Sequence, residues 1–330
     1  MNENDAAEQT DPKAMNENPN DEDTIEFLRT KGYIFQSKIG HGSFGTVFLV
    51  ISIKYHTQFV IKQITTKTAK KKADTNSNES PSDLEFPILS EIQSLSSLDH
   101  PNIIRLYDYF KRPKPDPSSE FKKEIVYLVF EYCENGSLND LIQKEGPIKP
   151  PRLYSYCYQI TSALNYCHQK KIVHRDIKPA NILIDRYNRI KIGDFGLSAT
   201  IQDGQMCHST AGSYLFMAPE ILDMTDFDPF SADIYALGIT FYMLSTGVPP
   251  WYSQSREVIR RMAKNGDLRF PPYVDHHFSH LIRSMVFQDP EKRPTMEFVM
   301  NHPILQHQIG GHLSLSEIRF NLSNQTLDKN

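Results

Sequence analysis

The chain has 330 residues, of which 39% are hydrophobic and 23% charged, and its formal net charge is −4. This composition supplies a core for one large domain or two ordinary ones and excludes a wholly disordered protein. The mild charge balance gives neither a basic field for nucleic acid nor a polybasic strip for a membrane surface. No stretch approaches the roughly eighteen apolar residues that a membrane span needs, so we expect no nucleic-acid partner and no membrane insertion.

The two ends of the chain differ in composition from its middle. Residues 1–23 hold eight acidic side chains against Lys13 alone, and the surrounding residues are rich in asparagine. Such a segment buries too little apolar surface to offset its chain entropy, so we predict a disordered acidic tail over 1–29. Residues 306–330 are predicted to be a short polar tail.

Between the tails, the hydrophobic pattern changes once along the chain. From Tyr33 it alternates as in strands, most clearly over 46–51 and 58–62. Two low-complexity stretches, 65–82 and 111–124, are predicted to be exposed loops. After Gly136 the spacing of apolar residues becomes three and four, as in the helix predicted over 153–167. We therefore predict a small β-rich part followed by a larger helical part.

A glycine pattern, GxGxxG, lies at residues 40–45. Alone it is weak evidence, because dinucleotide-binding folds share it, but those folds start a helix inside the motif. Here the residues after Gly45 are β-branched and aromatic, so the glycines join two strands. Backbone N–H groups free of Cβ atoms can approach phosphate oxygens closely, and we predict a phosphate-covering hairpin.

Lys62 ends the second predicted strand, and Glu91 lies in a helical stretch over 88–95. A single lysine on a strand is usually only solvated. An acidic partner on a nearby helix would fix its ammonium group, so we predict that Glu91 pairs with Lys62 and directs it toward phosphates.

Three further motifs follow in order: His174-Arg175-Asp176 with Lys178 and Asn181, then Asp194-Phe195-Gly196, then Ala218-Pro219-Glu220. With these motifs the chain resembles the eukaryotic protein kinase superfamily over residues 33–305. The resemblance implies an α+β bilobal fold with ATP in the cleft, an N-lobe over 33–132 and a C-lobe over 133–305.

The resemblance also assigns roles to the motif residues. Asp176 would accept the proton of the substrate hydroxyl, and Lys178 would contact the transferring phosphoryl group. Asn181 and Asp194 would hold two Mg²⁺ ions. The predicted catalytic residues are Asp176, Lys178, Lys62 and Glu91.

The ATP-contacting residues implied by the resemblance surround the cleft on both sides. Valine at position 60 departs from the alanine usual in the family. The implied contacts are Ile39, Gly40, His41, Gly42, Ser43, Phe44, Gly45, Thr46, Val47, Val60, Lys62, Glu131, Cys133 and Leu183.

The sequence between Lys178 and Asn181 resembles serine/threonine kinases, so we expect ATP-dependent transfer to serine or threonine of protein substrates. Residues 209–220 are similar to the calcium/calmodulin-dependent kinase group, especially its kinase-kinases. The C-terminal tail offers only Arg319 and Lys329 for a basic helical face, and we expect no calmodulin control. A pseudokinase and a small-molecule phosphotransferase remain as alternatives.

Two expectations concern the setting of the enzyme. The four cysteines are scattered without metal-ligand spacing, which favours a reducing compartment, so we predict a cytoplasmic or nuclear protein. In this family, a phosphate on the activation loop, which runs from Asp-Phe-Gly to Ala-Pro-Glu, commonly pairs with an arginine at the position that Arg175 resembles. Ser209 and Thr210 are therefore the candidate regulatory phosphosites.

Overall fold

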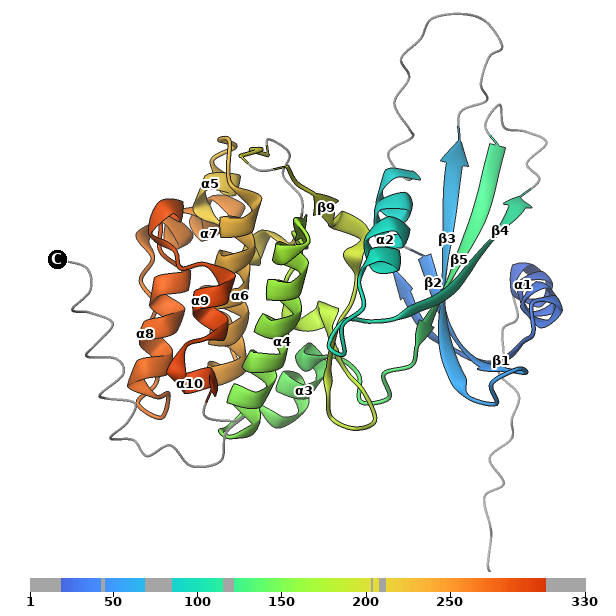
Figure 1. Ribbon diagram of the computed structural model, residues 1–330, viewed down its shortest axis with the longest axis horizontal. Coiled ribbons are helices and arrows are strands. Elements are labelled where there is room, and N and C mark those ends of the chain that lie inside the picture. The colour runs from blue at the N-terminus through green and yellow to red at the C-terminus, as the bar shows by residue number, and fades with distance from the viewer. Residues whose placement is uncertain are drawn as a thin grey trace, which may run out of the picture.

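The computed structural model describes residues 19–42, 45–68, 85–114, 122–202, 204–207 and 212–306. A sheet-rich lobe and a larger helical lobe lie side by side, joined after strand β5 (Figure 1). The helices and strands run as follows: α1 (Pro19–Thr30), β1 (Tyr33–Gly42), β2 (Gly45–Ser52), β3 (Gln58–Thr68), α2 (Glu85–Ser97), β4 (Leu106–Lys114), β5 (Lys122–Glu131), α3 (Leu138–Glu145), α4 (Arg152–Gln169), β6 (Ile172–Val173), β7 (Ile182–Ile184), β8 (Ile190–Ile192), β9 (Ala199–Thr200), α5 (Pro219–Leu222), α6 (Pro229–Thr246), α7 (Arg256–Asn265), α8 (His276–Met285), α9 (Met296–Met300) and α10 (Pro303–Gln306).

The first lobe is built on a five-stranded antiparallel sheet with strand order β1-β2-β3-β5-β4. Successive side chains of a strand point to opposite faces, and both faces of this sheet are apolar. On β5, Val126 and Leu128 belong to the main core, whereas Tyr127 and Val129 belong to a second core. Helices α2 and α1 lie on opposite sides of the sheet, so each face has its own cover (Figure 1).

Helix α1 corrects the prediction of a disordered tail over 1–29, because the structure places residues 19–30 in a helix. Thr24 and Leu28, spaced by one helical turn, are both buried, and Leu28 joins the second core. Phe27 packs its ring against Phe110 and Tyr127. An acidic composition therefore did not prevent order, since three side chains on one face find an aromatic surface to cover. Residues 1–18 lie outside the described part of the chain.

The predicted loops 65–82 and 111–124 are also partly wrong. Strand β3 continues to Thr68 and pairs it with Lys122, and β4 continues to Lys114 opposite Lys123. These polar residues are strand residues because the neighbouring strands supply their backbone hydrogen bonds. Residues 69–84 and 115–121 lie outside the described ranges.

The second lobe is organised around α6, a helix that is buried on nearly all sides. Asp228 caps its first turn by accepting from the N–H groups of Phe230 and Ser231. At the other end Gly247 adopts φ +76°, and a Cβ there would come within 2.9 Å of Pro147. Among the described residues, no helix combines the length and apolarity needed to cross a membrane.

Candidate active site

The glycine pattern lies at the ends of two paired strands, as predicted. Gly42 of β1 faces Gly45 of β2 in the register of the two strands. Gly45 adopts φ +126°, and a Cβ there would lie 1.9 Å from the carbonyl oxygen of Gln63, so a side chain does not fit. Ser43 and Phe44 lie outside the described residues, and His41 is placed only as part of β1.

Lys62 of β3 and Glu91 of α2 are brought together as predicted. The Nζ of Lys62 lies 3.1 Å from Oε2 of Glu91 and 3.2 Å from Oδ1 of Asp194. Burial lowers the pKa of Lys62, but the two carboxylates outweigh it and leave the pKa raised. Lys62 is therefore a fixed cation at the back of the cleft.

A cleft of about 480 Å³ opens between the lobes. Its lining includes the charged residues Lys62, Glu91 and Asp194. It also includes Glu131 and Cys133 of the hinge, the segment that joins the two lobes at the end of β5. The predicted apolar residues Ile39, Val47, Val60 and Leu183 line its walls. Gly40 and Thr46 are paired with neighbours on β1 and β2 and are not lining residues. An apolar slot with polar groups at its end suits a flat heterocycle bearing a charged tail.

Asp176 and Lys178 form a compact group near this cleft. Lys178 Nζ donates to Oδ2 of Asp176 and to Oγ of Ser213, each at 2.7 Å. Asn181 Nδ2 donates to the same Oδ2 at 2.9 Å, and Ser213 N–H donates to Oδ1 at 2.9 Å. Burial raises the pKa of Asp176, but these donors, Lys178 first, hold it below its usual value. The carboxylate is thus ionised and oriented at neutral pH.

The loop that carries Asp176 is anchored from below by the buried Asp233 of α6. Its carboxylate accepts the backbone N–H groups of His174 at 2.8 Å and Arg175 at 2.9 Å, and lies 3.0 Å from Nε2 of His168. Arg175 adopts φ +65°, an uncommon conformation for a non-glycine residue, which these bonds hold in place.

Asp194 and Asn181 have the chemistry of magnesium ligands. Asn181 uses its amide nitrogen for the backbone and side chain of Asp176, which directs its oxygen the other way. The side chain of Asp194 is 36% exposed. No cluster of three or more His, Cys, Asp or Glu suited to a metal exists in the described part of the chain. Two protein oxygens still fit Mg²⁺, because this ion keeps waters and takes substrate phosphates as its other ligands.

A second ion pair, which involves Glu220 of the Ala218-Pro219-Glu220 motif, lies away from the cleft. The guanidinium of Arg293 binds both carboxylate oxygens of Glu220, at 2.6 and 2.8 Å. Arg293 is buried and its side chain lies over the ring of Tyr235. The pair fastens the segment after the activation loop to the helical lobe.

Two contacts at the site were not foreseen. Ser213 contacts both Lys178 and Asp176, although the sequence analysis assigned it no role in the site. Gly212 adopts φ +106°, and a Cβ there would lie 2.4 Å from the carbonyl oxygen of Arg175. The Gly-Ser dipeptide therefore lets the activation segment touch the catalytic loop. The predicted phosphosites Ser209 and Thr210 lie outside the described residues.

The geometry of the cleft and catalytic loop agrees with the comparisons to known proteins. The family described as protein kinase domain matches residues 33–305. The chain belongs to this family, and the bilobal α+β fold predicted from the sequence is confirmed.

Relatives with curated names support the same placement. The chain is 32% identical over 274 residues to "Probable serine/threonine-protein kinase MARK-A" of Dictyostelium discoideum, covering 83% of this chain and 24% of that protein. It is 37% identical over 217 residues to "Sperm motility kinase 2A" of Mus musculus, covering 66% and 41% respectively. It is 32% identical over 298 residues to "Probable cell cycle serine/threonine-protein kinase CDC5 homolog" of Encephalitozoon cuniculi, covering 89% and 58%. The chain thus spans only part of the length of these relatives.

Proposed function

We propose that this chain is an ATP-dependent protein kinase that phosphorylates serine and threonine residues of protein substrates. The observation that carries the proposal is the ionised Asp176 held by Lys178, Asn181 and Ser213 beside a nucleotide-sized cleft. The fixed pair of Lys62 and Glu91 at the back of that cleft supports it. The matched relatives named serine/threonine-protein kinases favour this acceptor class.

Adenine would bind between the apolar walls, with its edge at the hinge. The N–H of Glu131 donates to the carbonyl of Arg105 at 3.3 Å, and the carbonyl of Cys133 accepts from Gly136 at 3.4 Å. We therefore assign the Glu131 carbonyl and the Cys133 N–H to the adenine edge. Ile39, Gly40 and Val47 would cover the base and the phosphates from above.

The reaction is an in-line displacement at the γ-phosphorus. The substrate oxygen bonds to phosphorus while the bond to the oxygen bridging the β- and γ-phosphates breaks, and ADP leaves. Asp176 orients the hydroxyl and takes its proton, and Lys178 stabilises the charge on the transferring group. Lys62 holds the α- and β-phosphates. Mg²⁺, two ions in our proposal, would be held by Asp194 and Asn181 and would neutralise charge developing on the phosphates.

Replacing Asp176 with asparagine tests this assignment. Asp176→Asn keeps the shape of the side chain but removes the proton acceptor, so we expect kcat to fall by at least about 100-fold with little change in ATP affinity. Asp194→Asn should instead weaken Mg²⁺-dependent nucleotide binding. Turnover of labelled ATP on a peptide array and calorimetric binding of nucleotide separate the two effects. A wild-type chain that binds ATP without turnover would be a pseudokinase and would overturn the proposal.

The cysteines bear on the location of the protein. The free thiols Cys133, Cys157 and Cys167 are buried, and burial raises the pKa of each, as expected of packed thiols. Scattered thiols of this kind fit a cytoplasmic or nuclear protein. The absence of calmodulin control stays a prediction, because residues 307–330 lie outside the described ranges.

A further inference from the structure

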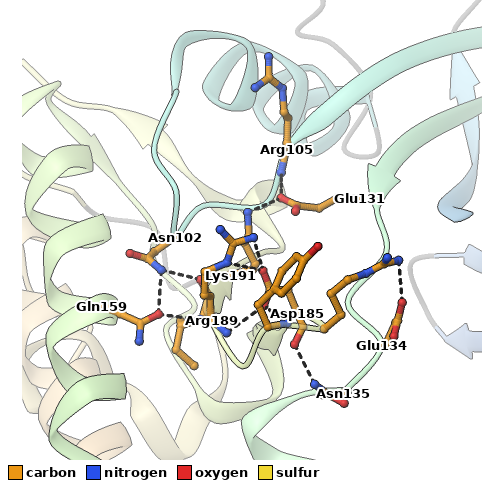
Figure 2. A network of polar contacts seen from close by, with 12 residues as sticks. Asn102, Arg105, Glu131, Glu134, Asn135, Gln159, Asp185, Arg189 and Lys191 are labelled. Atoms are coloured by element: carbon orange, nitrogen blue, oxygen red, sulfur yellow. Dashed lines mark hydrogen bonds and ion pairs between the residues drawn. The ribbon is translucent and has the colours of Figure 1, made fainter. Parts of the chain in front are cut away.

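Strand β8 contains a lysine that is buried, although its alternation with two isoleucines would predict an exposed side chain. Lys191 stands between Ile190 and Ile192 and is only 7% exposed. Its Nζ lies 2.9 Å from Oε1 of Glu131, at the end of β5 in the other lobe (Figure 2). A buried ammonium group is costly to strip of its partner, so this contact is a firm link between the lobes.

Glu131 is held by more than its carboxylate. The same Oε1 accepts the backbone N–H of Arg105 at 2.9 Å, while the N–H of Glu131 donates to the carbonyl of Arg105 at 3.3 Å. Both the side-chain carboxylate and the backbone N–H of Glu131 therefore have fixed partners, Lys191 and Arg105.

The position of Lys191 is itself fixed by polar contacts of β8. Asn102 Nδ2 donates to the carbonyl of Ile190 at 2.9 Å and to Oε1 of Gln159 at 3.0 Å, and that Oε1 also accepts the N–H of Ile190 (Figure 2). The N–H of Ile192 donates to the carbonyl of Asn102 at 2.8 Å. Thus the loop before β4, helix α4 and β8 form one frame, and Lys191 projects from it to the hinge.

We infer that Lys191 is a positioning residue that sets nucleotide selectivity: through the Glu131 carboxylate it fixes the Glu131 carbonyl to which adenine would donate. This inference rests on the proposed function only in taking ATP as the nucleotide. The adenine amino group donates a hydrogen bond, whereas the hypoxanthine of ITP presents an oxygen at that place and a ring N–H where adenine accepts. ITP otherwise carries the same sugar and triphosphate.

Without the lysine, the Glu131 carboxylate would keep only the Arg105 N–H and would turn toward water, moving the backbone that carries it. The loss of the lysine should therefore lower the affinity for ATP and not the affinity for ITP. If Lys191 only stabilised the fold, its loss would lower both affinities together. This difference separates positioning from structural support.

The experiment measures calorimetric affinities of the full chain for Mg-ATP and Mg-ITP. Lys191→Met should lower the affinity for ATP by about fivefold, which corresponds to the contribution of a typical hydrogen bond. The affinity for ITP should stay within about twofold of the wild-type value. Lys191→Arg keeps the charge and should retain most of the selectivity. Arg189→Met is the matched control, because Arg189 pairs with Asp185 on the same hairpin and not with the hinge.

Equal weakening of both nucleotides in Lys191→Met, or unchanged ATP affinity, overturns the inference. A loss of selectivity in Arg189→Met as large as in Lys191→Met overturns it as well. If Lys191→Met does not fold, Glu131→Gln gives the same test, because it keeps the side-chain shape and removes the charge that Lys191 holds. Because binding needs no phosphoryl transfer, a chain that binds ATP without turnover would refute the proposed function and leave this result standing.

Discussion

Glu134, which lines the nucleotide cleft, forms an ion pair with Arg186, with 2.8 Å between the carboxylate oxygen and the guanidinium nitrogen. Glu134 is one of two acids that could select arginine upstream of the phosphorylated residue, since Ser137 and Ala180 stand where arginine-selecting relatives supply acids. The other, Asp140, accepts the N–H and hydroxyl of Ser137 at 2.9 and 2.7 Å. Both acids already have partners.

We therefore expect little selection for arginine at the third position upstream. The pair with Arg186 is partly exposed, and exchanging one exposed partner for another is worth at most about 1 kcal/mol, or roughly fivefold. Arg186→Gln should release Glu134 and raise the arginine preference, which a peptide library measures. A tenfold preference in the wild type would contradict the prediction.

Helix α1 is predicted to contribute to the stability of the kinase domain. Leu28 is fully buried, so Leu28→Ala should lower the free energy of unfolding by about 2–5 kcal/mol. Glu26→Ala, on the exposed side of the same helix, should change it by less than about 0.5 kcal/mol. Urea unfolding of both variants is the measurement. Equal, small effects would mean that α1 does not dock on the sheet in solution.

Reasoning from the sequence found the motif residues of the site but missed helix α1. Asp176, Asn181 and Asp194 could be found because their chemistry fixes both residue type and spacing. Thr24, Phe27 and Leu28 also carry helical spacing, but the mean composition of 1–29 outweighed that signal. The pairing of Lys191 with Glu131 could not be predicted, because the two residues are 60 positions apart and only the folded chain brings them together.

The buried His302 should make the free energy of unfolding fall at acid pH. Burial lowers the pKa of His302 from 6.5 to about 4, with the charges of His277 and His280 adding to the effect. The unfolded chain takes up this proton below pH 6.5 and the folded chain does not, so stability is lost as the pH falls from about 6.5 to 4. Between pH 7.5 and pH 5 the loss should be about 2 kcal/mol. His302→Gln should remove that part of the pH dependence in urea unfolding, and identical slopes for both proteins would refute it.

Phosphate on Ser209 or Thr210 is predicted to regulate the activity of the protein. Arg175 is the candidate partner, and its guanidinium Nε already donates to the carbonyl of Leu197. Kinases of this family that are strongly activated by phosphorylation bind the phosphate with two further basic side chains. One comes from the helix that bears Glu91 here and the other from just after Asp-Phe-Gly, and this chain has Pro87 and Ala199 at these two positions. Phosphate should therefore add about one charge-assisted bond, roughly 1–3 kcal/mol, or about ten- to a hundredfold in the active population.

The unphosphorylated enzyme should accordingly retain activity, since Lys62 already contacts Glu91 and Lys178 already contacts Asp176. The test compares a Ser209→Ala, Thr210→Ala double variant with phosphorylated wild type on one peptide. We expect its kcat/KM to be lower by about ten- to a hundredfold. A residual value below about a thousandth would exceed what one arginine–phosphate contact supplies, and would mean that other groups bind the phosphate.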